Sequence, residues 1–301
     1  MGMRDLGDTG LKVSRLGMGL YEIGESPTRP AEAEVAQLLN AALDSGINFL
    51  DTSACYGISE ELIGRTIAHR RQEYILATKC GHVTGGYQGE EWTAQTIKDS
   101  IHRSLVRLKT DYLDLVQLHS CEVNVLERGE AVQALLDAKD AGKTRYAGYS
   151  GDNDAARWAV ESGLFDTLQT SFNLVDQHAR TRLFPLAQAR HMGIIVKRPI
   201  ANGMWGASKS FNTYTDDYFE RARIMAKDGP IPGAPENRIL LALGFTLAHE
   251  EVDTAIVGTC NHSHLRANIA WVENGLSFAP EVVEELHRRF ACVGQQWIQL
   301  T

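Results

Sequence analysis

The sequence lacks any apolar run long enough to cross a membrane and any cluster of basic residues. Its longest apolar stretch, ILLALGFTLA from Ile239, is about half of a membrane span and therefore predicts a buried helix. The formal net charge is −8, and no run of Lys or Arg interrupts this acidic balance. These absences disfavour a membrane protein and a nucleic-acid partner, but they leave room for a local basic site that binds an anionic cofactor.

Paired cysteines are also missing. The five cysteines stand at positions 55, 80, 121, 260 and 292, an odd number without the spacing of a disulfide framework. The amino-terminal residues MGMRDLGDTG contain no apolar signal region. Together these features favour a reducing environment, and we expect a cytoplasmic protein.

The composition is that of a globular protein with a large core, with 44% apolar and 23% charged residues among 301. Short, continuously apolar segments alternate along the chain with segments of helical periodicity. Continuously apolar strands followed by helices are typical of parallel sheets that are covered on both faces. Because such strand–helix units repeat along the whole chain, we expect a single (β/α)8 TIM-barrel domain over residues 1–301.

The predicted elements follow this alternation along the whole chain. Strands are expected at 15–21, 47–50, 74–79, 113–118, 144–149, 167–171, 193–198 and 253–257. Helices are expected at 31–45, 58–70, 93–108, 127–141, 152–162, 178–192, 235–250 and 262–274. A β-hairpin at 3–13 precedes them, and an extra helix at 278–298, with Pro280 in its first turn, follows them. The long connection at 199–232, with a helix at 216–227, follows the seventh strand and should help to shape the site.

Polar side chains stand at the ends of three consecutive predicted strands. Asp51 follows the apolar run INFL, Lys79 follows YILAT, and His119 follows LDLVQL. Tyr56 lies just beyond the first of these strands, in the segment DTSACYG. Because the carboxyl ends of the strands of a βα barrel converge on the face that carries active sites, we expect these four side chains to meet in one site.

These residue types suit proton transfer to or from a substrate oxygen. The hydroxyl of tyrosine has an ordinary pKa near ~10, and a nearby lysine ammonium should lower the pKa of Tyr56. A carboxylate at Asp51 would hold Lys79 charged and in place, and His119 could donate a hydrogen bond to a carbonyl oxygen. None of the four is a good covalent nucleophile in this arrangement, so we expect the proton transfer to accompany hydride transfer with a cofactor.

The segments that carry these residues, FLDTSACYG, ATKCG and YLDLVQLHS, resemble those of the aldo-keto reductase superfamily. The likeness continues through GYS, LQTSFN and IVGTCNHSHLRANI, so it covers nearly the whole chain. The resemblance implies a (β/α)8 barrel, a hairpin that plugs its amino-terminal mouth, and a catalytic tetrad of Asp51, Tyr56, Lys79 and His119. It also implies an NAD(P)-dependent oxidoreductase that acts on a small carbonyl or alcohol substrate, such as an aldehyde, a ketone or a sugar.

The resemblance further implies residues that hold the nicotinamide end of the cofactor. Ser150 and Gln169 match family residues that bind its carboxamide. Gly151 stands where the family has Asn, so that contact is either lost or made by Asn153. Gly19, in the first strand, permits close approach of the cofactor, with tight backbone packing as the alternative reason for a glycine.

Two basic residues, Lys197 and Arg198, end the seventh predicted strand. The family often carries an aromatic residue there, which stacks on the nicotinamide, so the segment VKRP departs from that pattern. A cationic side chain could approach the pyrophosphate of the cofactor instead, and plain surface charge is the alternative.

The last motif, IVGTCNHSHLRANI, predicts an anion site at the amino terminus of a helix. Gly258 and Thr259 match the family there, and Asn268 matches a residue that contacts adenine. Members that select the 2′-phosphate usually add Lys or Arg, whereas this chain offers only Arg266 and His264. We therefore expect NADP to be preferred over NAD by a modest margin.

The sequence offers weaker signals for a metal, for the substrate pocket and for a role without catalysis. No metal is expected, because His262 and His264 lack supporting Cys or carboxylate ligands. Trp92 and Trp205 are candidate walls of the substrate pocket, with ordinary packing as the alternative. The rival to an enzyme is a cofactor-binding regulatory protein, similar to the channel subunits of this superfamily, but the intact tetrad argues against it. The individual substrate and the oligomeric state stay open.

Overall fold

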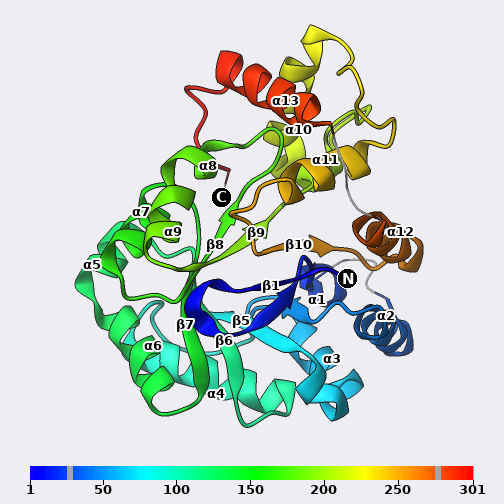
Figure 1. Ribbon diagram of the computed structural model, residues 1–301. Coiled ribbons are helices and arrows are strands. Elements are labelled where there is room, and N and C mark those ends of the chain that lie inside the picture. Colours follow the sequence, from blue (N-terminus) through cyan, green and yellow to red (C-terminus); the bar gives the residue numbers. More distant parts are fainter. Residues whose placement is uncertain (26–29, 275–278, 301) are drawn as a thin grey trace.

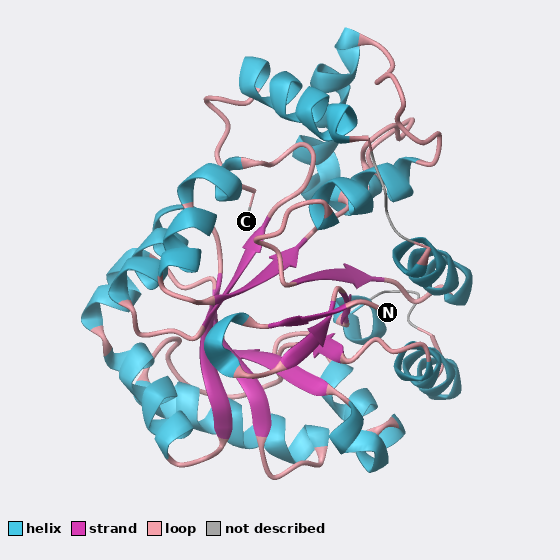
Figure 2. Ribbon diagram, in the orientation of Figure 1, coloured by secondary structure: helices cyan, strands magenta, loops and turns pink. Residues whose placement is uncertain are grey.

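The computed structural model describes residues 1–25, 30–274 and 279–300. Its centre is a closed barrel of parallel strands in the spatial order β10-β3-β4-β5-β6-β7-β8-β9. The barrel strands are β3 (Leu16–Gly19), β4 (Phe49–Asp51), β5 (Ile75–Cys80), β6 (Leu113–His119), β7 (Thr144–Ser150), β8 (Thr167–Ser171), β9 (Gly193–Lys197) and β10 (Thr254–Gly258). Helices surround this barrel on the outside (Figures 1 and 2), so the (β/α)8 prediction is confirmed.

The outer layer is made of helices that alternate with the strands. They are α1 (Tyr21–Glu25), α2 (Glu32–Asp44), α3 (Ser59–Thr66), α4 (Ala94–Leu108), α5 (Val123–Arg128), α6 (Glu130–Asp140), α7 (Asn153–Ser162), α8 (His178–Arg182), α9 (Phe184–Ala189), α10 (Thr213–Met225), α11 (Arg238–Leu247), α12 (His262–Glu273) and α13 (Pro280–Val293). Short 3-10 turns lie at Gly7–Thr9, Ala68–Glu73, Ala201–Gly203 and Ala226–Asp228. Within the described ranges, no helix is long and apolar enough to cross a membrane.

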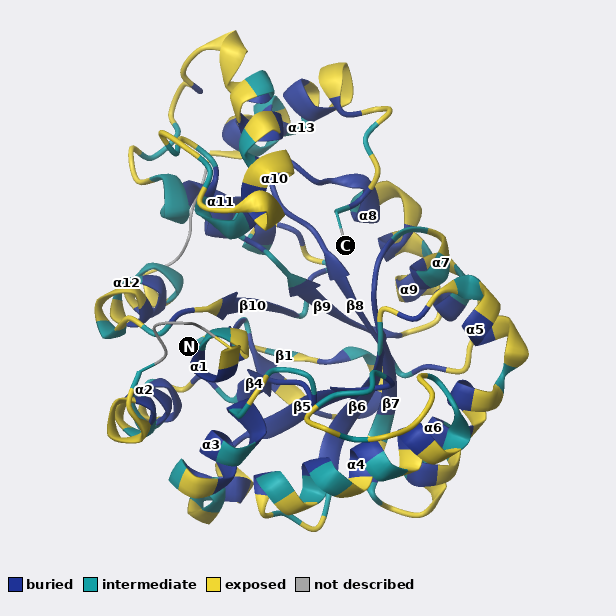
Figure 3. Cartoon of the chain, turned by 180° about the vertical axis from the view of Figure 1, so that it is seen from behind, coloured by how far each residue is buried: buried dark blue, intermediate teal, exposed yellow. Residues whose placement is uncertain are grey.

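Most residues of the barrel strands are buried because both faces of the sheet are covered. All residues of β5 are buried, as a strand between a filled barrel interior and a helical layer requires. The helices are amphipathic instead: α4 buries Ile97, Ile101 and Leu108 on one face, and it exposes Lys98 on the other. Figure 3 shows this arrangement as buried strands inside a ring of helices with exposed outer surfaces.

The amino-terminal hairpin closes one mouth of the barrel. Strands β1 (Met3–Asp5) and β2 (Lys12–Ser14) pair in antiparallel fashion around a turn in which Gly10 has a φ of 70°. Between and beside these strands, Leu6, Leu11 and Val13 are buried. They form one apolar cluster with barrel residues Phe49, Ile75, Ala77, Leu115, Ile195 and Ile256. The predicted hairpin plug is thereby confirmed.

Two of the predicted helices are each divided into two α-helices in the structure. The helix expected at 127–141 is divided into α5 and α6 at Gly129, whose φ of 76° lies in the left-handed region. The helix expected at 178–192 is divided into α8 and α9, and Pro185 stands in the first turn of α9. Proline lacks the amide hydrogen that would continue α8, so both breaks have a local cause.

The carboxyl end of the chain differs most from its prediction. The expected helix at 278–298 corresponds to α13, which begins at Pro280 and ends at Val293, while residue 278 lies outside the described residues. From Gly294 the chain leaves the helix, and residues 294–300, here called the C-terminal segment, turn back towards the barrel. Figure 1 shows the carboxyl terminus close to the ends of β8 and β9.

Candidate active site

The four side chains of the predicted tetrad come together at the carboxyl ends of β4, β5 and β6. Lys79 Nζ donates to Asp51 Oδ2 at 2.5 Å and to the carbonyl oxygen of Thr52 at 2.9 Å. The same Nζ lies 4.9 Å from the centroid of the Tyr56 ring. The rings of Tyr56 and His119 meet edge to face with their centroids 5.8 Å apart. Lysine and carboxylate are both buried, so the ion pair is shielded from water.

Burial and neighbouring charges set the protonation of this group. Burial by itself lowers the pKa of Lys79, but the Asp51 carboxylate outweighs it, so the net pKa is raised. Burial raises the pKa of the Tyr56 hydroxyl, and the charge of Lys79 offsets only part of that rise. Burial, together with the charge of Lys79, lowers the pKa of His119 well below its ordinary value. At neutral pH the site therefore holds an ammonium, a protonated phenol and a neutral imidazole.

The net direction for Tyr56 corrects the sequence-based expectation of a lowered pKa. Lys79 acts with the expected sign, but removal of the hydroxyl from water has the larger effect. The Tyr56 phenol therefore keeps its proton at neutral pH, and a negative charge on its oxygen would depend on Lys79 for stabilisation.

Two glutamines hold the remaining oxygen of Asp51. Gln169 Nε2 donates to Asp51 Oδ1 at 2.7 Å, and Gln117 Nε2 donates to the same atom at 3.3 Å. The other end of the Gln169 amide accepts a hydrogen bond from Ser150 Oγ at 2.8 Å. Gln169 and Ser150 thus brace the tetrad, and their predicted contact with the cofactor carboxamide stays a prediction. Sequence reasoning missed Gln117, which the alternation of β6 directs into the barrel.

A second histidine and a second tyrosine border the tetrad. His82 Nε2 donates to the backbone oxygen of His119 at 2.9 Å, and its Nδ1 lies 3.1 Å from Glu91 Oε1. The Tyr21 ring meets the Tyr56 ring edge to face at 5.2 Å. His82 lies in the loop after β5, and Tyr21 begins α1 shortly after β3. Their place just beyond a strand end was the signal available in the sequence.

Trp92 belongs to this side of the site. Its ring lies 4.8 Å from the His82 ring, and its own φ of 65° shows that the backbone is turned to bring it there. The indole rests on Gly81, because a Cβ added to this glycine would lie only 1.9 Å from the ring. Trp205 lies elsewhere, in the connection after β9, where its backbone oxygen accepts a 3.4 Å hydrogen bond from Arg238. No described contact brings Trp205 to the tetrad.

Lys197 ends β9 and Arg198 directly follows it, and both side chains are bonded within the protein. Lys197 Nζ lies 2.9 Å from Asp152 Oδ2. Burial raises the pKa of Asp152, but Lys197 outweighs it, so this pKa is lowered and the carboxylate is ionised. Arg198 donates to Ser171 Oγ at 3.2 Å and to the backbone oxygen of Leu300. Plain surface charge is therefore not the reason for these two cations.

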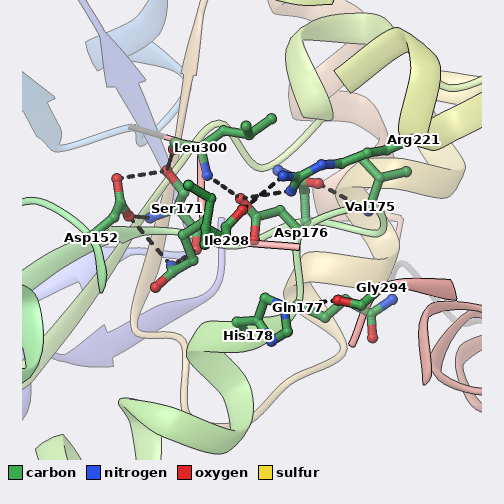
Figure 4. A network of polar contacts seen from close by, with 12 residues as sticks. Asp152, Ser171, Val175, Asp176, Gln177, His178, Arg221, Gly294, Ile298 and Leu300 are labelled. Carbon is green, nitrogen blue, oxygen red and sulfur yellow. Dashed lines mark hydrogen bonds and ion pairs between the residues drawn. The ribbon is translucent and has the colours of Figure 1, made fainter. Parts of the chain in front are cut away.

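The C-terminal segment is bound to the same side of the barrel (Figure 4). Gln299 Nε2 donates to the Ser171 carbonyl oxygen at 2.9 Å and to Thr170 Oγ1 at 3.2 Å. The Leu300 amide donates to Asp176 Oδ2 at 2.9 Å. Asn153, the candidate substitute for the missing family Asn, donates a hydrogen bond from its side-chain nitrogen to the Gln299 carbonyl oxygen at 3.1 Å. Sequence reasoning missed all of these contacts.

On the side of the site formed by β3 and β10, the backbone is left uncovered by side chains of its own. In the strand register Gly19 lies between Gly258 and Asp51, so two glycines adjoin the tetrad where a flat ligand could approach. Thr259 and Asn268 are buried beside this strip. These positions are compatible with a nicotinamide cofactor that runs from the tetrad towards α12.

The amino terminus of α12 is already capped. Asn261 Oδ1 accepts hydrogen bonds from the amides of Ser263 at 2.7 Å and His264 at 3.3 Å. His264 and Arg266 are exposed on the helix, as a contact with a phosphate requires. Glu22, which sequence reasoning missed, has its pKa raised by burial and accepts a hydrogen bond from the Cys260 amide. A carboxyl group next to the predicted anion site weakens its positive character.

A metal centre finds no support in the part of the chain that the structure describes. There, no three His, Cys, Asp or Glu side chains gather closely enough to hold an ion. His262 and His264, whose spacing was considered in the sequence, therefore have no further ligands among the described residues.

Comparisons with known proteins agree with this geometry. The model of the aldo/keto reductase family matches residues 15–288. L-galactose dehydrogenase of Arabidopsis thaliana is 29% identical over 282 residues, which cover 90% of this chain and 88% of that protein. The NADH-specific methylglyoxal reductase of Escherichia coli is 26% identical, covering 94% of this chain and 98% of that one. Among solved structures, the holo form of an aldo-keto reductase from Bacillus halodurans superposes with a TM-score of 0.81 at 27% identity, covering 96% of each chain.

Proposed function

Because the chain belongs to the aldo/keto reductase family, we propose that it transfers a hydride between a nicotinamide cofactor and a small carbonyl or alcohol substrate. The cofactor, when bound, supplies or accepts the hydride. Tyr56 donates the proton to the substrate oxygen in reduction and takes it back in oxidation. Lys79, fixed by Asp51, stabilises the phenolate that forms when Tyr56 gives up its proton, and His119 donates a hydrogen bond to the same substrate oxygen.

One observation carries this proposal. The Lys79 ammonium is paired with Asp51 at 2.5 Å and lies 4.9 Å from the Tyr56 ring, in a buried place where its charge acts strongly. A buried ion pair is a weak source of stability, so its position under a tyrosine is better explained by chemistry. A protein that only binds cofactor would have no need of this arrangement.

Replacement of the proton donor tests the proposal. Tyr56→Phe should lower turnover by a factor on the order of 10² or more, because general acid catalysis is lost, while cofactor affinity stays near that of the unmodified protein. Tyr21→Phe is the matched control, since Tyr21 packs against Tyr56 but is 53% exposed and makes no contact with Lys79 among the described residues. A Tyr56→Phe variant that keeps most of its rate would remove Tyr56 from the mechanism.

We further propose that the cofactor preference is for NADP and that it is smaller than in family members that carry two basic residues at these positions. Arg266 and His264 are exposed on α12 and can meet a 2′-phosphate, and one charge-assisted hydrogen bond contributes about 1.5–3 kcal/mol. The carboxyl of Glu22 works against an added negative charge, and the name of the Escherichia coli relative gives NADH as its cofactor.

The preference is measured as the ratio of the dissociation constants of NADP and NAD at matched salt. Arg266→Ala should narrow this ratio by roughly tenfold or more, because one charge-assisted contact is lost. Lys98→Ala, which removes an exposed cation from α4, should leave it unchanged. Tighter binding of NAD by the unmodified protein would show that Arg266 does not face the ribose.

The substrate is proposed to bind between Tyr56, His119 and the aromatic side chains beside them. His82 and Trp92 support this place, since both pack on the tetrad side of the barrel mouth. Trp205 is the weaker candidate, because its described contacts lie with α11. Turnover assays with a panel of sugars, aliphatic aldehydes, aromatic aldehydes and small ketones would select among the substrate classes. Absence of turnover with every class, despite cofactor binding, would favour a regulatory protein on the same fold.

A further inference from the structure

Two side chains from the loop after β4 approach a single nitrogen of His119. Ser53 Oγ lies 3.3 Å from His119 Nδ1, and Cys55 Sγ lies 3.3 Å from the same atom. The two groups also contact each other, with Ser53 Oγ 3.1 Å from Cys55 Sγ. Neither is needed to hold Lys79 or Asp51, so their convergence on Nδ1 calls for a separate explanation.

This contact bears on which nitrogen of the His119 imidazole carries the hydrogen. Because burial lowers the pKa of His119, the ring is neutral at neutral pH and carries one hydrogen, on either Nδ1 or Nε2. Within residues 1–25, 30–274 and 279–300, no hydrogen bond to Nε2 is found, whereas Nδ1 has two neighbours. The partner of Nδ1 therefore decides which nitrogen can donate to a substrate.

Ser53 is placed to be the donor to Nδ1. Its Oγ already accepts a 3.4 Å hydrogen bond from the Cys55 amide, which leaves its own hydrogen to point elsewhere. The residue is only 1% exposed, so water does not compete for that hydrogen. Its two candidate acceptors are the imidazole nitrogen and the sulfur of Cys55, and nitrogen is much the stronger acceptor.

Cys55 has a smaller part in this arrangement. Burial raises the pKa of its thiol, so the group keeps its hydrogen at neutral pH. A thiol is a weak donor and a weak acceptor, and it cannot replace a hydroxyl in fixing the orientation of the ring. Cys55 thus serves as a matched control that touches the same nitrogen.

We propose that Ser53 is a positioning residue whose hydroxyl donates to His119 Nδ1 and so keeps the imidazole hydrogen on Nε2. This nitrogen has no partner in the described part of the protein and is left for the substrate oxygen. The catalytic value of this arrangement rests on the proposed function, but the tautomer itself does not.

Nuclear magnetic resonance of the histidine ring nitrogens tests the tautomer directly, with the His119 signals assigned by their loss in His119→Gln. We expect the unmodified protein to show the hydrogen on Nε2 of His119. Ser53→Ala should give a mixture of the two tautomers, and Ser53→Thr, which keeps the hydroxyl, should restore the Nε2 form. Cys55→Ala should leave the Nε2 form unchanged. A hydrogen on Nδ1 in the unmodified protein, or an unaltered Nε2 form in Ser53→Ala, would overturn the proposal.

Turnover measured on the same variants separates this proposal from the proposed function. Because one neutral hydrogen bond is removed, Ser53→Ala should lower kcat roughly threefold to tenfold with little change in cofactor affinity. Ser53→Thr should recover most of the rate. If the tautomer shifts in Ser53→Ala while kcat is unchanged, then Ser53 does fix the ring, and it is the role of His119 as a donor to the substrate that fails.

Discussion

The two halves of the barrel mouth are built in different ways. In the half formed by β4, β5 and β6, Lys79 takes both of its partners, Asp51 and the Thr52 carbonyl, from the end of the adjacent strand. In the half formed by β7, β8 and β9, Arg198 donates instead to the backbone of Leu300, which is 102 residues away. Lys79 has its partners once β4 and β5 have paired, and the barrel strand β8 adds Gln169 to Asp51, whereas the second half also needs the end of the chain.

This difference separates two properties of the site. The geometry of the tetrad depends on strands that form the centre of the fold, so it should persist in any state in which the barrel is intact. The β9 end, where the sequence suggests a cationic side chain near the cofactor pyrophosphate, depends on the C-terminal segment and its hydrogen bonds. Loss of that segment should therefore affect cofactor binding before it affects the tetrad.

The largest effect is expected when the tetrad loses its cation. Lys79→Met leaves Asp51 buried without a counter-charge, so turnover should fall by a factor on the order of 10² or more and stability by about 3–5 kcal/mol. The double variant Asp51→Asn with Lys79→Met should recover stability but not turnover. Denaturant unfolding and steady-state rates measure the two quantities.

Lys197→Met is the matched change in the other half. It should destabilise the protein less, because Asp152 keeps the nearby charge of Arg198 together with hydrogen bonds from the Ser171 amide at 2.7 Å and Thr170 Oγ1 at 2.8 Å. Asp51 keeps only the hydrogen bonds from the neutral amides of Gln169 and Gln117 when Lys79 is lost. An equal or larger loss of stability in Lys197→Met would contradict the difference that we draw between the halves.

An intermediate effect on stability is expected from the titration of Asp176, whose Oδ2 accepts a hydrogen bond from the Leu300 amide. Burial raises the pKa of Asp176 to about 7 from an ordinary value of 3.8, and its Oδ1 has no hydrogen-bond partner. The folded protein keeps this proton up to about pH 7, whereas the unfolded chain loses it near pH 4. The contribution of Asp176 to the free energy of unfolding is therefore full at low pH and is lost as the pH rises from about 4 to about 7.

Asp176→Asn mimics the protonated form and tests this sign. The free energy of unfolding of Asp176→Asn, taken relative to that of the unmodified protein, should be larger at pH 8 than at pH 5 by about 2–4 kcal/mol. Denaturant unfolding at the two pH values measures this change. Asp152→Asn is the opposite control, because the pKa of Asp152 is lowered and its loss leaves Lys197 unpaired at either pH. A stability difference between Asp176→Asn and the unmodified protein that does not vary with pH would show that this carboxyl does not titrate in the window.

The smallest effect is expected from one glutamine of the C-terminal segment. Gln299→Ala removes the hydrogen bonds to Ser171 and Thr170, which should cost about 1–3 kcal/mol and speed amide exchange near the end of β8. Turnover at saturating cofactor should stay the same, since the tetrad is untouched. Gln296→Ala, an exposed position in the same segment, should change neither quantity. A fall in turnover for Gln299→Ala at saturating cofactor would show that the halves are coupled.

The sequence could predict the first half because its signals are local. Asp51, Lys79 and His119 each follow an apolar strand directly, and the convergence of strand ends in a barrel then brings them together. The order of strands and helices was readable for the same reason. The breaks at Gly129 and Pro185 were also marked in the sequence, but the helical periodicity on each side concealed them.

The second half could not be predicted in this way. The partners of Asn153, Ser171 and Arg198 come from Gln299 and Leu300, and no periodicity or spacing relates residues that are more than a hundred positions apart. The prediction of a lowered pKa for Tyr56 was wrong for a related reason. Its direction depends on how far burial outweighs the charge of Lys79, and burial is a property of the folded surroundings.

The contact between Gly81 and Trp92 has a consequence for how the proposed substrate pocket can change. A side chain at 81 would overlap the indole, since even its Cβ would lie 1.9 Å from the ring. One wall of the pocket can therefore be supplied by the end of β5 or by the loop before α4, but not by both. Substitutions at the two positions are expected to covary, and a library intended to alter substrate range should randomise them as a pair, because single changes at Gly81 will mostly be lost to steric overlap.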